Sequence, residues 1–155
     1  LYNRAGFYHN VKKLLKRMKK EDKLAFILFM DIDGLKPVND TLGHEMGDWL
    51  IREMAEVVRM NLTDNQMAMR YGGDEFVIFG ITDSEEEAYG FPEKLRESMR
   101  DRNMSNDNLF ELKASMGVST YRAQEITSLD ALIEEADKKM YEEKRIRKAN
   151  AQRSQ

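Results

Sequence analysis

The sequence contains no cysteine, which excludes disulfide bonds and thiolate metal sites. The absence is compatible with a reducing compartment, and we expect the domain to be cytoplasmic. No apolar run approaches the roughly 20 residues that cross a bilayer, and no secretory leader opens the chain. We therefore expect no contact between this domain and a membrane. Because the chain begins with Leu1 rather than Met, we expect it to be part of a longer protein, which can itself be membrane-anchored.

The chain also lacks a strong excess of charge, since 25 Lys and Arg stand against 28 Asp and Glu, for a net charge of −3. Such a balance creates no strong field for nucleic acid, so we expect no nucleic-acid partner. Residues 8–20 are locally basic and carry apolar side chains at helical spacing. They indicate an amphipathic helix with a solvated basic face, and a binding patch is the alternative.

No Gly-, Pro- or Ser-rich linker interrupts the 155 residues, so we expect one domain over residues 1–155. Hydrophobic periodicity and turn residues predict the order α-β-α-α-β-β-α-β-α. After the first helix we expect a buried strand over 25–31, a short helix between Gly34 and Gly43, and a helix over 50–62. Two hairpin strands follow over 67–71 and 75–81, joined by a two-residue Gly72-Gly73 turn. The last expected elements are a helix over 88–99 capped by Ser84 and Glu87, a strand or a hairpin pinched at Gly117 over 109–121, and a helix over 129–140 capped by Thr127 and Asp130. The central hairpin makes the predicted sheet mostly antiparallel, so the fold class is α+β with helices flanking the sheet.

Carboxylates gather where the buried strands are predicted to end. Asp31 and Asp33 stand two apart at the end of the apolar run and so share one face, and Asp74 and Glu75 follow the Gly-Gly turn. If the hairpin packs beside the first strand, Asp31 and Asp74 lie within reach of one cation. Each motif alone is more often a cap or a solvated loop. Together they favour metal-assisted phosphoryl transfer, because two close carboxylates are costly unless a cation lies between them.

No G-x-x-x-x-G-K-[ST] phosphate-binding loop is present, so phosphate groups need another site. The turn Gly34-Leu35-Lys36 opens a predicted helix. Its backbone N–H groups and the positive end of the helix dipole suit an anion.

Several segments resemble one family in order and at matching spacings. Residues 70–76 read RYGGDEF, the signature that names the GGDEF family, and residues 31–44 resemble its D-x-D-x-F-K-x-x-N-D-x-x-G-H segment, continued by Gly47-Asp48. Residues 1–4 (LYNR) resemble the family's opening motif, and residues 136–144 resemble its closing A-D-x-A-L-Y-x-A-K. The resemblance covers nearly the whole chain.

This resemblance implies a polymerase-palm-like or nucleotidyl-cyclase-like fold and a diguanylate cyclase, which condenses two GTP into the second messenger cyclic di-GMP and two pyrophosphates. It also implies Mg²⁺ or Mn²⁺ as cofactor, with two ions per GTP. Each protomer of a homodimer is then expected to supply half of the active site, under an upstream sensor domain of a longer signalling protein. The alternative is a catalytically inactive GTP-binding regulatory module.

The matched positions imply individual roles. Asp31, the Ile32 carbonyl, Asp74 and Glu75 are the expected metal ligands, and Asp74 and Glu75 are the expected catalytic groups. The expected substrate-binding residues are Gly34, Leu35, Lys36, Asn39, Asp48, Gly72, Gly73, Lys144 and Lys148. Among them Asn39 and Asp48 match positions that contact guanine, whose N1–H and N2–H₂ a carboxylate can accept. His44 and Asp40 lie in the signature, and we interpret them as structural.

The chain departs from the family at several positions. Lys148 stands where arginine is usual and Arg147 where glycine is usual, and lysine lacks the bidentate fork, so we expect a weaker grip on the triphosphate. Leu35 replaces a phenylalanine. Thr63 and Gln66 occupy the positions of the family's inhibitory R-x-x-D motif, so we expect that product site to be absent.

Overall fold

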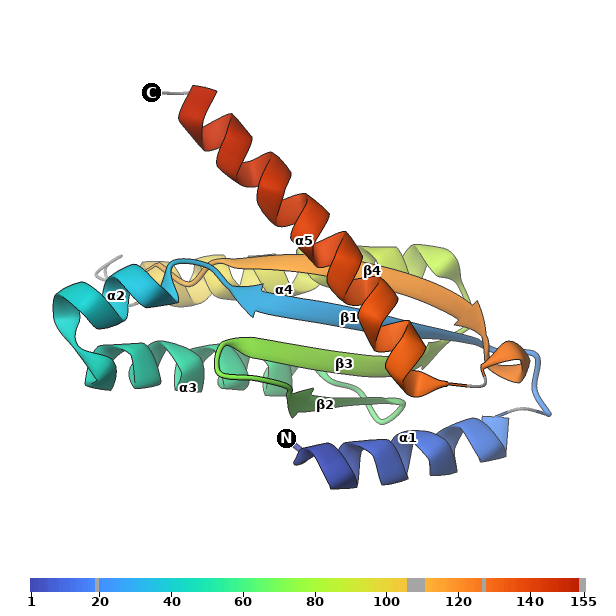
Figure 1. Cartoon of the computed structure of the whole chain (residues 1–155). Helices are drawn as coiled ribbons and strands as arrows, with labels where there is room; N and C mark the ends of the chain where they lie inside the picture. The colour runs from blue at the N-terminus through green and yellow to red at the C-terminus, as the bar shows by residue number, and fades with distance from the viewer. Residues whose placement is uncertain (19, 106–110, 127, 154–155) are drawn as a thin grey trace.

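Four antiparallel strands form one sheet in the order β2-β3-β1-β4 in the computed structural model, which describes residues 1–18, 20–105, 111–126 and 128–153 (Figure 1). The strands are β1 Leu24–Ile32, β2 Gln66–Arg70, β3 Glu75–Thr82 and β4 Ala114–Arg122. β1 lies in the interior of the sheet and is buried from its second residue to its end. The strand is buried on both faces, and this explains why its sequence is a continuous apolar run.

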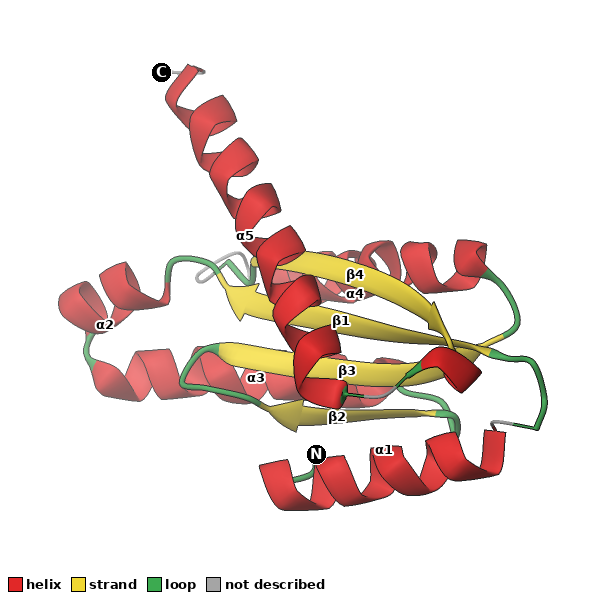
Figure 2. Ribbon diagram, turned by 45° about the vertical axis from the view of Figure 1, so that its right-hand side comes forward, coloured by secondary structure: helices red, strands yellow, loops and turns green. Residues whose placement is uncertain are grey.

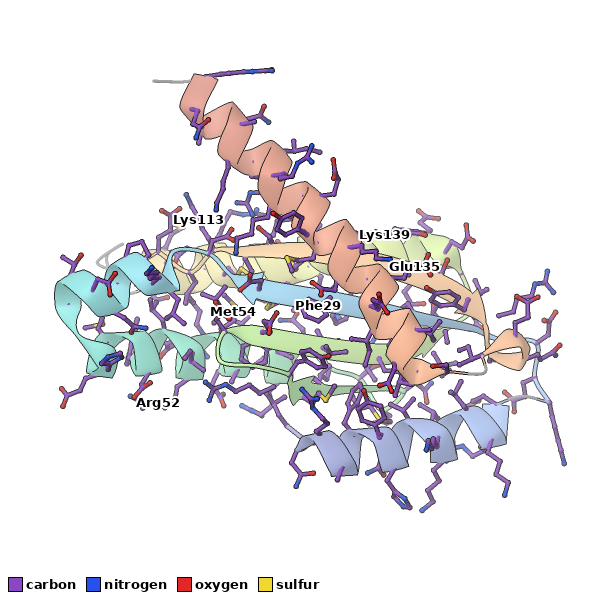
Figure 3. The ribbon with its side chains drawn as sticks, in the orientation of Figure 1. Phe29, Arg52, Met54, Lys113, Glu135 and Lys139 are labelled. Carbon is purple, nitrogen blue, oxygen red and sulfur yellow. The ribbon has the colours of Figure 1, made fainter. Side chains whose placement is uncertain are left out.

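Helices cover the two faces of the sheet (Figure 2). They are α1 Arg4–Met18, α2 Leu35–Leu42, α3 His44–Asn61, α4 Glu85–Ser105 and α5 Leu129–Arg153, with a short 3₁₀ turn, η1, at Ala123–Glu125. Alternate residues of β1 enter two separate cores: Leu28 packs with α3 and α4, whereas Phe29 packs with α1 and α5. Figure 3 labels Phe29 and also Met54, which belongs to the α3–α4 core. The predicted α+β class and order of elements are confirmed.

The first helix begins earlier than predicted, at Arg4 rather than residue 8. Asn3 is the reason, because its Oδ1 accepts the Gly6 N–H at 2.7 Å and so caps the first turn. The spacing of apolar residues does not reveal a helix start that is set by a polar capping residue.

The prediction of a two-residue Gly-Gly turn is wrong, since β2 ends at Arg70 and β3 begins at Glu75. A tight two-residue hairpin turn needs positive φ, and neither Gly72 nor Gly73 has it. Instead, Arg70 donates from Nη2 to the Gly73 carbonyl at 2.6 Å and from Nε to the Gly72 carbonyl at 3.1 Å. The guanidinium thus supports a wider loop.

The region predicted over 109–121 as a strand or a hairpin is one strand, β4, and residues 109–110 lie outside the described residues. Gly117 does not pinch it. A Cβ at this position would lie 2.3 Å from the Met140 nitrogen and 2.4 Å from the Ala136 carbonyl oxygen. Glycine is therefore present because the backbone of α5 packs directly on the strand.

One predicted cap is confirmed in its first half. Ser84 Oγ accepts the Glu87 N–H at 3.2 Å, but the Glu87 carboxylate accepts from the Thr82 hydroxyl at 2.8 Å instead of returning to Ser84. For the other predicted cap, Thr127 lies outside the described residues, and Ser128 Oγ accepts the Ala131 N–H at 3.3 Å at the start of α5. Within the part of the chain that the structure describes, none of the helices combines the length and apolarity needed to traverse a bilayer.

Candidate active site

A cavity of about 570 Å³ opens where β1 ends, between the start of α2 and the outer half of α5. It is lined by Ile32, Asp33, Gly34, Leu35, Lys36, Pro37, Asp74, Lys113, Ser115, Lys144, Arg147, Lys148 and Ala151. Seven of the residues expected from the sequence are in this set: Ile32, Gly34, Leu35, Lys36, Asp74, Lys144 and Lys148. The cavity therefore joins the predicted phosphate-binding turn to one of the predicted carboxylates.

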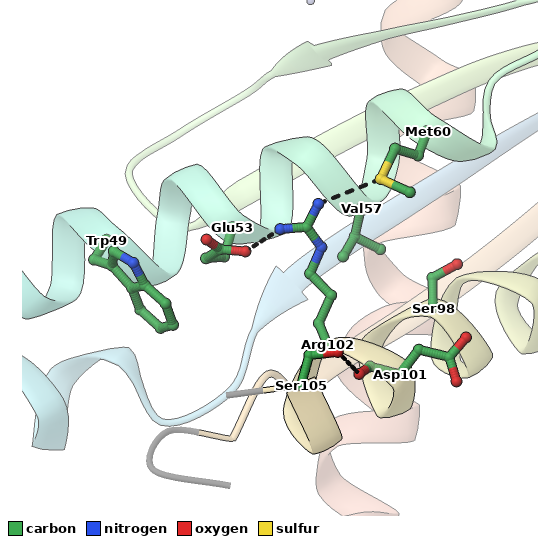
Figure 4. Close-up of a pocket in the computed structure, with 8 residues that line it drawn as sticks. All are labelled: Trp49, Glu53, Val57, Met60, Ser98, Asp101, Arg102 and Ser105. Atoms are coloured by element: carbon green, nitrogen blue, oxygen red, sulfur yellow. Dashed lines mark hydrogen bonds and ion pairs between the residues drawn. The ribbon is translucent and has the colours of Figure 1, made fainter. Parts of the chain in front are cut away.

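A second cavity, of about 480 Å³, lies between α3 and α4 and contains none of the expected site residues (Figure 4). Its arginine, Arg102, is paired with Glu53 across the groove, and Trp49 stands at one end. We place the candidate site in the first cavity, because its cations and carboxylates match phosphate and metal chemistry.

The hairpin packs beside β1, which was the condition for bringing Asp31 and Asp74 together, and this pairing assembles the acidic residues. Asp31 faces Glu75 in the β1–β3 register, and the Ile32 N–H donates to the Asp74 carbonyl at 2.9 Å. Burial raises the pKa of Asp31, and the neighbouring Asp74 carboxylate adds to the rise, whereas Lys144 opposes it. Burial, followed by the charges of Asp31 and Asp74, also raises the pKa of Glu75. The carboxylates therefore lie close enough to repel one another.

The donor atoms fit a hard cation in part. Asp31 Oδ2 accepts from Lys144 Nζ at 2.7 Å, whereas Asp31 Oδ1 is buried without a hydrogen-bond partner among the described residues. No group of three or more acidic or histidine side chains in the described ranges is arranged to hold a metal by itself. Mg²⁺ commonly uses one or two carboxylates and takes its other ligands from water and substrate phosphates. Asp31, Asp74 and the Ile32 carbonyl suit that partial shell.

The Gly34–Lys36 turn opens α2, as the sequence predicted. Gly34 adopts φ 76° and ψ 12°, in the left-handed region, immediately before α2 begins. A side chain at this position would strain the backbone, so glycine is needed for the turn itself. The turn opens on the cavity and presents the N-terminus of α2 to it.

Other expected residues lie away from the cavity lining. The Glu75 side chain turns toward the loop and lies against Gly72. A Cβ at Gly72 would be only 2.3 Å from Glu75 Oε1. Gly72 and Gly73 accept hydrogen bonds from Arg70 through their carbonyls. The structure therefore does not bring these three expected site residues into the cavity.

Asn39 and Asp48 meet at the junction of α2 and α3, outside the same cavity. Asn39 Oδ1 is buried without a hydrogen-bond partner in the described part of the chain. It packs so tightly on Gly47 that a Cβ there would lie 1.7 Å away. Gly47 directly precedes Asp48, which is exposed on α3. The two expected guanine-contacting residues are thus brought to one place.

Sequence reasoning missed four residues in the lining, and treated Arg147 only as a departure from the family. The missed residues are Pro37, Lys113, Ser115 and Ala151; Lys113 is labelled in Figure 3. Lys113 and Ser115 join the site because β4 pairs with the end of β1, where the Asp33 N–H donates to the Lys113 carbonyl at 2.8 Å. The spacing of residues in the sequence does not specify that register, because it is set by the pairing of β4 with β1.

Comparisons with known proteins show the family and the fold to which the chain is similar. The family described as "Diguanylate cyclase, GGDEF domain" matches residues 1–150. Diguanylate cyclase A of Treponema denticola is 34% identical over 127 residues, which are 81% of this chain and 34% of that protein. The cyclic di-GMP phosphodiesterase NbdA of Pseudomonas aeruginosa is 28% identical over 98% of this chain and 19% of its own length. The chain thus spans about a third or less of these curated relatives. A crystal structure of the GGDEF domain of DgcB from Caulobacter crescentus in complex with c-di-GMP matches with a TM-score of 0.80 and 27% identity, over 94% of this chain and 86% of that one.

Proposed function

Because the chain belongs to the GGDEF domain family, we propose that it is a diguanylate cyclase domain, which condenses two GTP into cyclic di-GMP and two pyrophosphates. One observation carries the proposal: the Gly34–Lys36 turn and the cations of α5 share a cavity with Asp74. A triphosphate needs backbone donors and cations, and its transfer needs carboxylates that hold divalent ions. This cavity supplies both.

In the proposed reaction, the 3′-oxygen of each GTP forms a bond to the α-phosphorus of the other. At each phosphorus the bond to pyrophosphate breaks, so two pyrophosphates leave and the ring closes. Lys36, Lys144 and Lys148 bind the phosphates, and the N–H groups after Gly34 orient them. Two Mg²⁺ or Mn²⁺ ions per GTP, when bound, would polarise the phosphate and acidify the attacking hydroxyl. Asp31, the Ile32 carbonyl and Asp74 would hold one ion, and Glu75 would contribute to the second.

A carboxylate near the attacking oxygen must accept the 3′-hydroxyl proton. We assign this role to Asp74 or Glu75. The raised pKa of Glu75, caused first by burial and then by Asp31 and Asp74, favours proton uptake at its carboxylate. In the structure Glu75 lies over Gly72, so the proposal requires it to turn toward the substrate.

Asn39 and Asp48 are proposed to bind guanine, with Gly72 and Gly73 approaching the nucleotide. The unpartnered Asn39 Oδ1 supports this, because a buried carbonyl oxygen without a donor gains from the amino group of a base. Asp48 is exposed and can accept from N1–H and N2–H₂ together.

We further propose that catalysis needs a homodimer. The described chain offers one cavity with this turn and these cations, and cyclisation requires two GTP molecules in opposite orientations. Each protomer would then bind one GTP, and specific activity should rise with protein concentration. Specific activity that stays constant with concentration, in a sample shown to be monomeric, would contradict this.

We also propose a cytoplasmic location and control by a sensor domain of a longer protein, in keeping with the small share of its relatives' length that the chain covers.

A regulatory GTP-binding module remains the second candidate. Lys148 favours it, because a lysine grips phosphate less specifically than the usual arginine. One relative is named a phosphodiesterase, so family membership by itself does not fix the reaction. The complete set of Asp31, Asp74 and Glu75 favours the cyclase.

Incubation of the protein, dimerised by a fused coiled coil, with GTP and Mg²⁺ tests the proposal by product identification. The cyclase predicts cyclic di-GMP, which Asp74→Ala should reduce about a thousandfold, equivalent to roughly 4 kcal/mol of barrier. Asp64→Ala is the matched control, because Asp64 is exposed and outside the cavity. Binding of GTP without product would favour the regulatory module, and an Asp74→Ala variant with a tenth of normal turnover would contradict the role of Asp74.

A further inference from the structure

The outer half of α5 is attached to the rest of the domain in a different way from its inner half. Its buried residues end at Met140, and the helix then extends beyond the sheet (Figure 1). From Glu143 onward polar contacts hold it. Glu143 Oε1 accepts from Arg96 at 2.6 Å and from the Met116 N–H at 3.2 Å. The cations that line the cavity are on this polar segment, so their positions depend on such contacts.

Arg147 makes the contacts nearest to the phosphate-binding turn. Its Nη1 donates to the Ala114 carbonyl at 2.7 Å and to Asp33 Oδ2 at 3.3 Å. Ala114 opens β4 and Asp33 directly follows β1, and the two strands pair there through Ile32 and Ala114. One guanidinium therefore ties α5 to the ends of two strands.

Asp33 connects the Arg147 contact to the Gly34–Lys36 turn. Its Oδ1 accepts from the Ser115 hydroxyl at 2.9 Å, and its N–H donates to the Lys113 carbonyl at 2.8 Å. With Arg147 on Oδ2, both carboxylate oxygens and the backbone N–H are engaged. The next residue is Gly34, which has the left-handed conformation. A shift of Asp33 would move the turn directly, because one peptide bond joins them.

We infer that Arg147 is a positioning residue of the phosphate site. Through Asp33 it holds the Gly34–Lys36 turn in place for the triphosphate, and through the same contacts it keeps Lys144 and Lys148 on the cavity wall. The inference rests on the proposed function in taking GTP as the ligand. It gives a role to a residue at which the chain departs from the family, where glycine is usual.

The test measures two things for each variant and for the wild type. Calorimetry in the presence of Mg²⁺ gives the affinity for GTP, and initial rates of the dimerised protein give KM and kcat. Arg147→Ala should weaken GTP binding and raise KM by about tenfold, as expected for loss of a charge-assisted contact, with kcat changed less than about twofold. Arg147→Lys should restore part of the affinity, because an ammonium keeps the charge next to Asp33. Arg145→Ala is the control, since Arg145 is exposed and pairs with Glu142 on the same helix.

One further measurement separates positioning from direct phosphate binding, and another shows that the effect is confined to the phosphate site. Asp33→Asn should weaken GTP binding by a similar factor, and the double variant should add little, because the two residues act as one unit. Guanosine, which has no phosphate, should bind all variants equally. If Asp33→Asn leaves affinity unchanged or improves it, Arg147 does not act through Asp33 and the inference is overturned.

The outcomes also separate this inference from the proposed function. Wild-type protein that binds GTP without making product would refute the cyclase and leave the affinity comparison valid. Wild-type protein that does not bind GTP would refute both. If Arg147→Ala does not fold, Arg147→Lys and Asp33→Asn carry the test. Equal GTP affinity in folded Arg147→Ala and wild type overturns the inference.

Discussion

Lys144 Nζ lies 2.7 Å from Asp31 Oδ2, although 113 positions separate the two residues in the sequence. Their side chains are 25% and 12% exposed, so water screens the pair weakly. Burial lowers the pKa of Lys144, but the hydrogen bond and charge of Asp31 outweigh burial and raise it overall. In the nucleotide-free chain a lysine thus neutralises a carboxylate that we propose as a metal ligand.

Lys144→Met should destabilise the nucleotide-free domain by about 1–3 kcal/mol, because Asp31 would remain buried beside Asp74 without its cation. Mg²⁺ should recover part of this loss by taking the place of the ammonium group. Urea unfolding with and without Mg²⁺ measures both effects. Lys138→Met is the control, since its ion pair with Glu134 is exposed. A variant as stable as wild type without Mg²⁺ would show that the pair contributes nothing.

Asp48→Ala should weaken GTP binding by at least about tenfold and reduce the preference for GTP over ATP, because the carboxylate that we propose as the acceptor for two guanine donors is removed. Calorimetry with both nucleotides measures the preference. Glu45→Ala is the control, as Glu45 is another exposed acidic residue of α3 and lies in its first turn. An unchanged preference in Asp48→Ala would mean that guanine is recognised elsewhere.

Cyclic di-GMP should inhibit the proposed cyclase only by competition with GTP. Thr63 carries no charge, and Gln66 Oε1 already accepts the Thr63 N–H at 3.0 Å with only 9% of Gln66 exposed. The arginine fork and carboxylate of the family's product site are therefore missing at this turn. Initial rates at several GTP concentrations measure the pattern. Noncompetitive inhibition at low micromolar product would reveal a second product site.

Gly117→Ala should destabilise the domain by about 2–3 kcal/mol, because the added methyl group meets the α5 backbone and the helix must move. Gly90→Ala is the control. Nothing lies within 4 Å of a Cβ at Gly90, and alanine in that helix should stabilise by about 0.5–1 kcal/mol. Thermal unfolding of both variants checks the contrast. Equal behaviour of the two would contradict the close packing of α5 on β4.

Burial, followed by its hydrogen bond to Glu135, raises the pKa of Tyr121 from 10.0 to about 12. The folded state therefore binds the phenol proton more tightly than the unfolded state. This contribution to stability is complete below the unfolded pKa and is lost as pH rises through about 12. The stability difference between wild type and Tyr121→Phe should shrink over this range. Unfolding at stepped alkaline pH measures it, with exposed Tyr141→Phe as the control.

Much of the fold could be predicted from the sequence, because the information is local. The apolar run before Asp31 predicted a strand buried on both faces, and Gly34 and Gly43 predicted the two ends of the short helix between them. Adjacency along the chain was enough to place Asp74 and Glu75 at the start of the second hairpin strand. Side-chain period and backbone preference act over a few residues, so they can be read without tertiary contacts.

Tertiary structure decided the rest. The width of the Gly72-Gly73 loop follows from the Arg70 guanidinium, and the need for Gly117 follows from the backbone of α5. The pairs Lys144–Asp31 and Arg147–Asp33 exist because α5 crosses the sheet where β1 ends. Their partners are more than 100 residues apart in the chain. A residue's own neighbours cannot specify such contacts, because they depend on the angle and register at which whole elements dock.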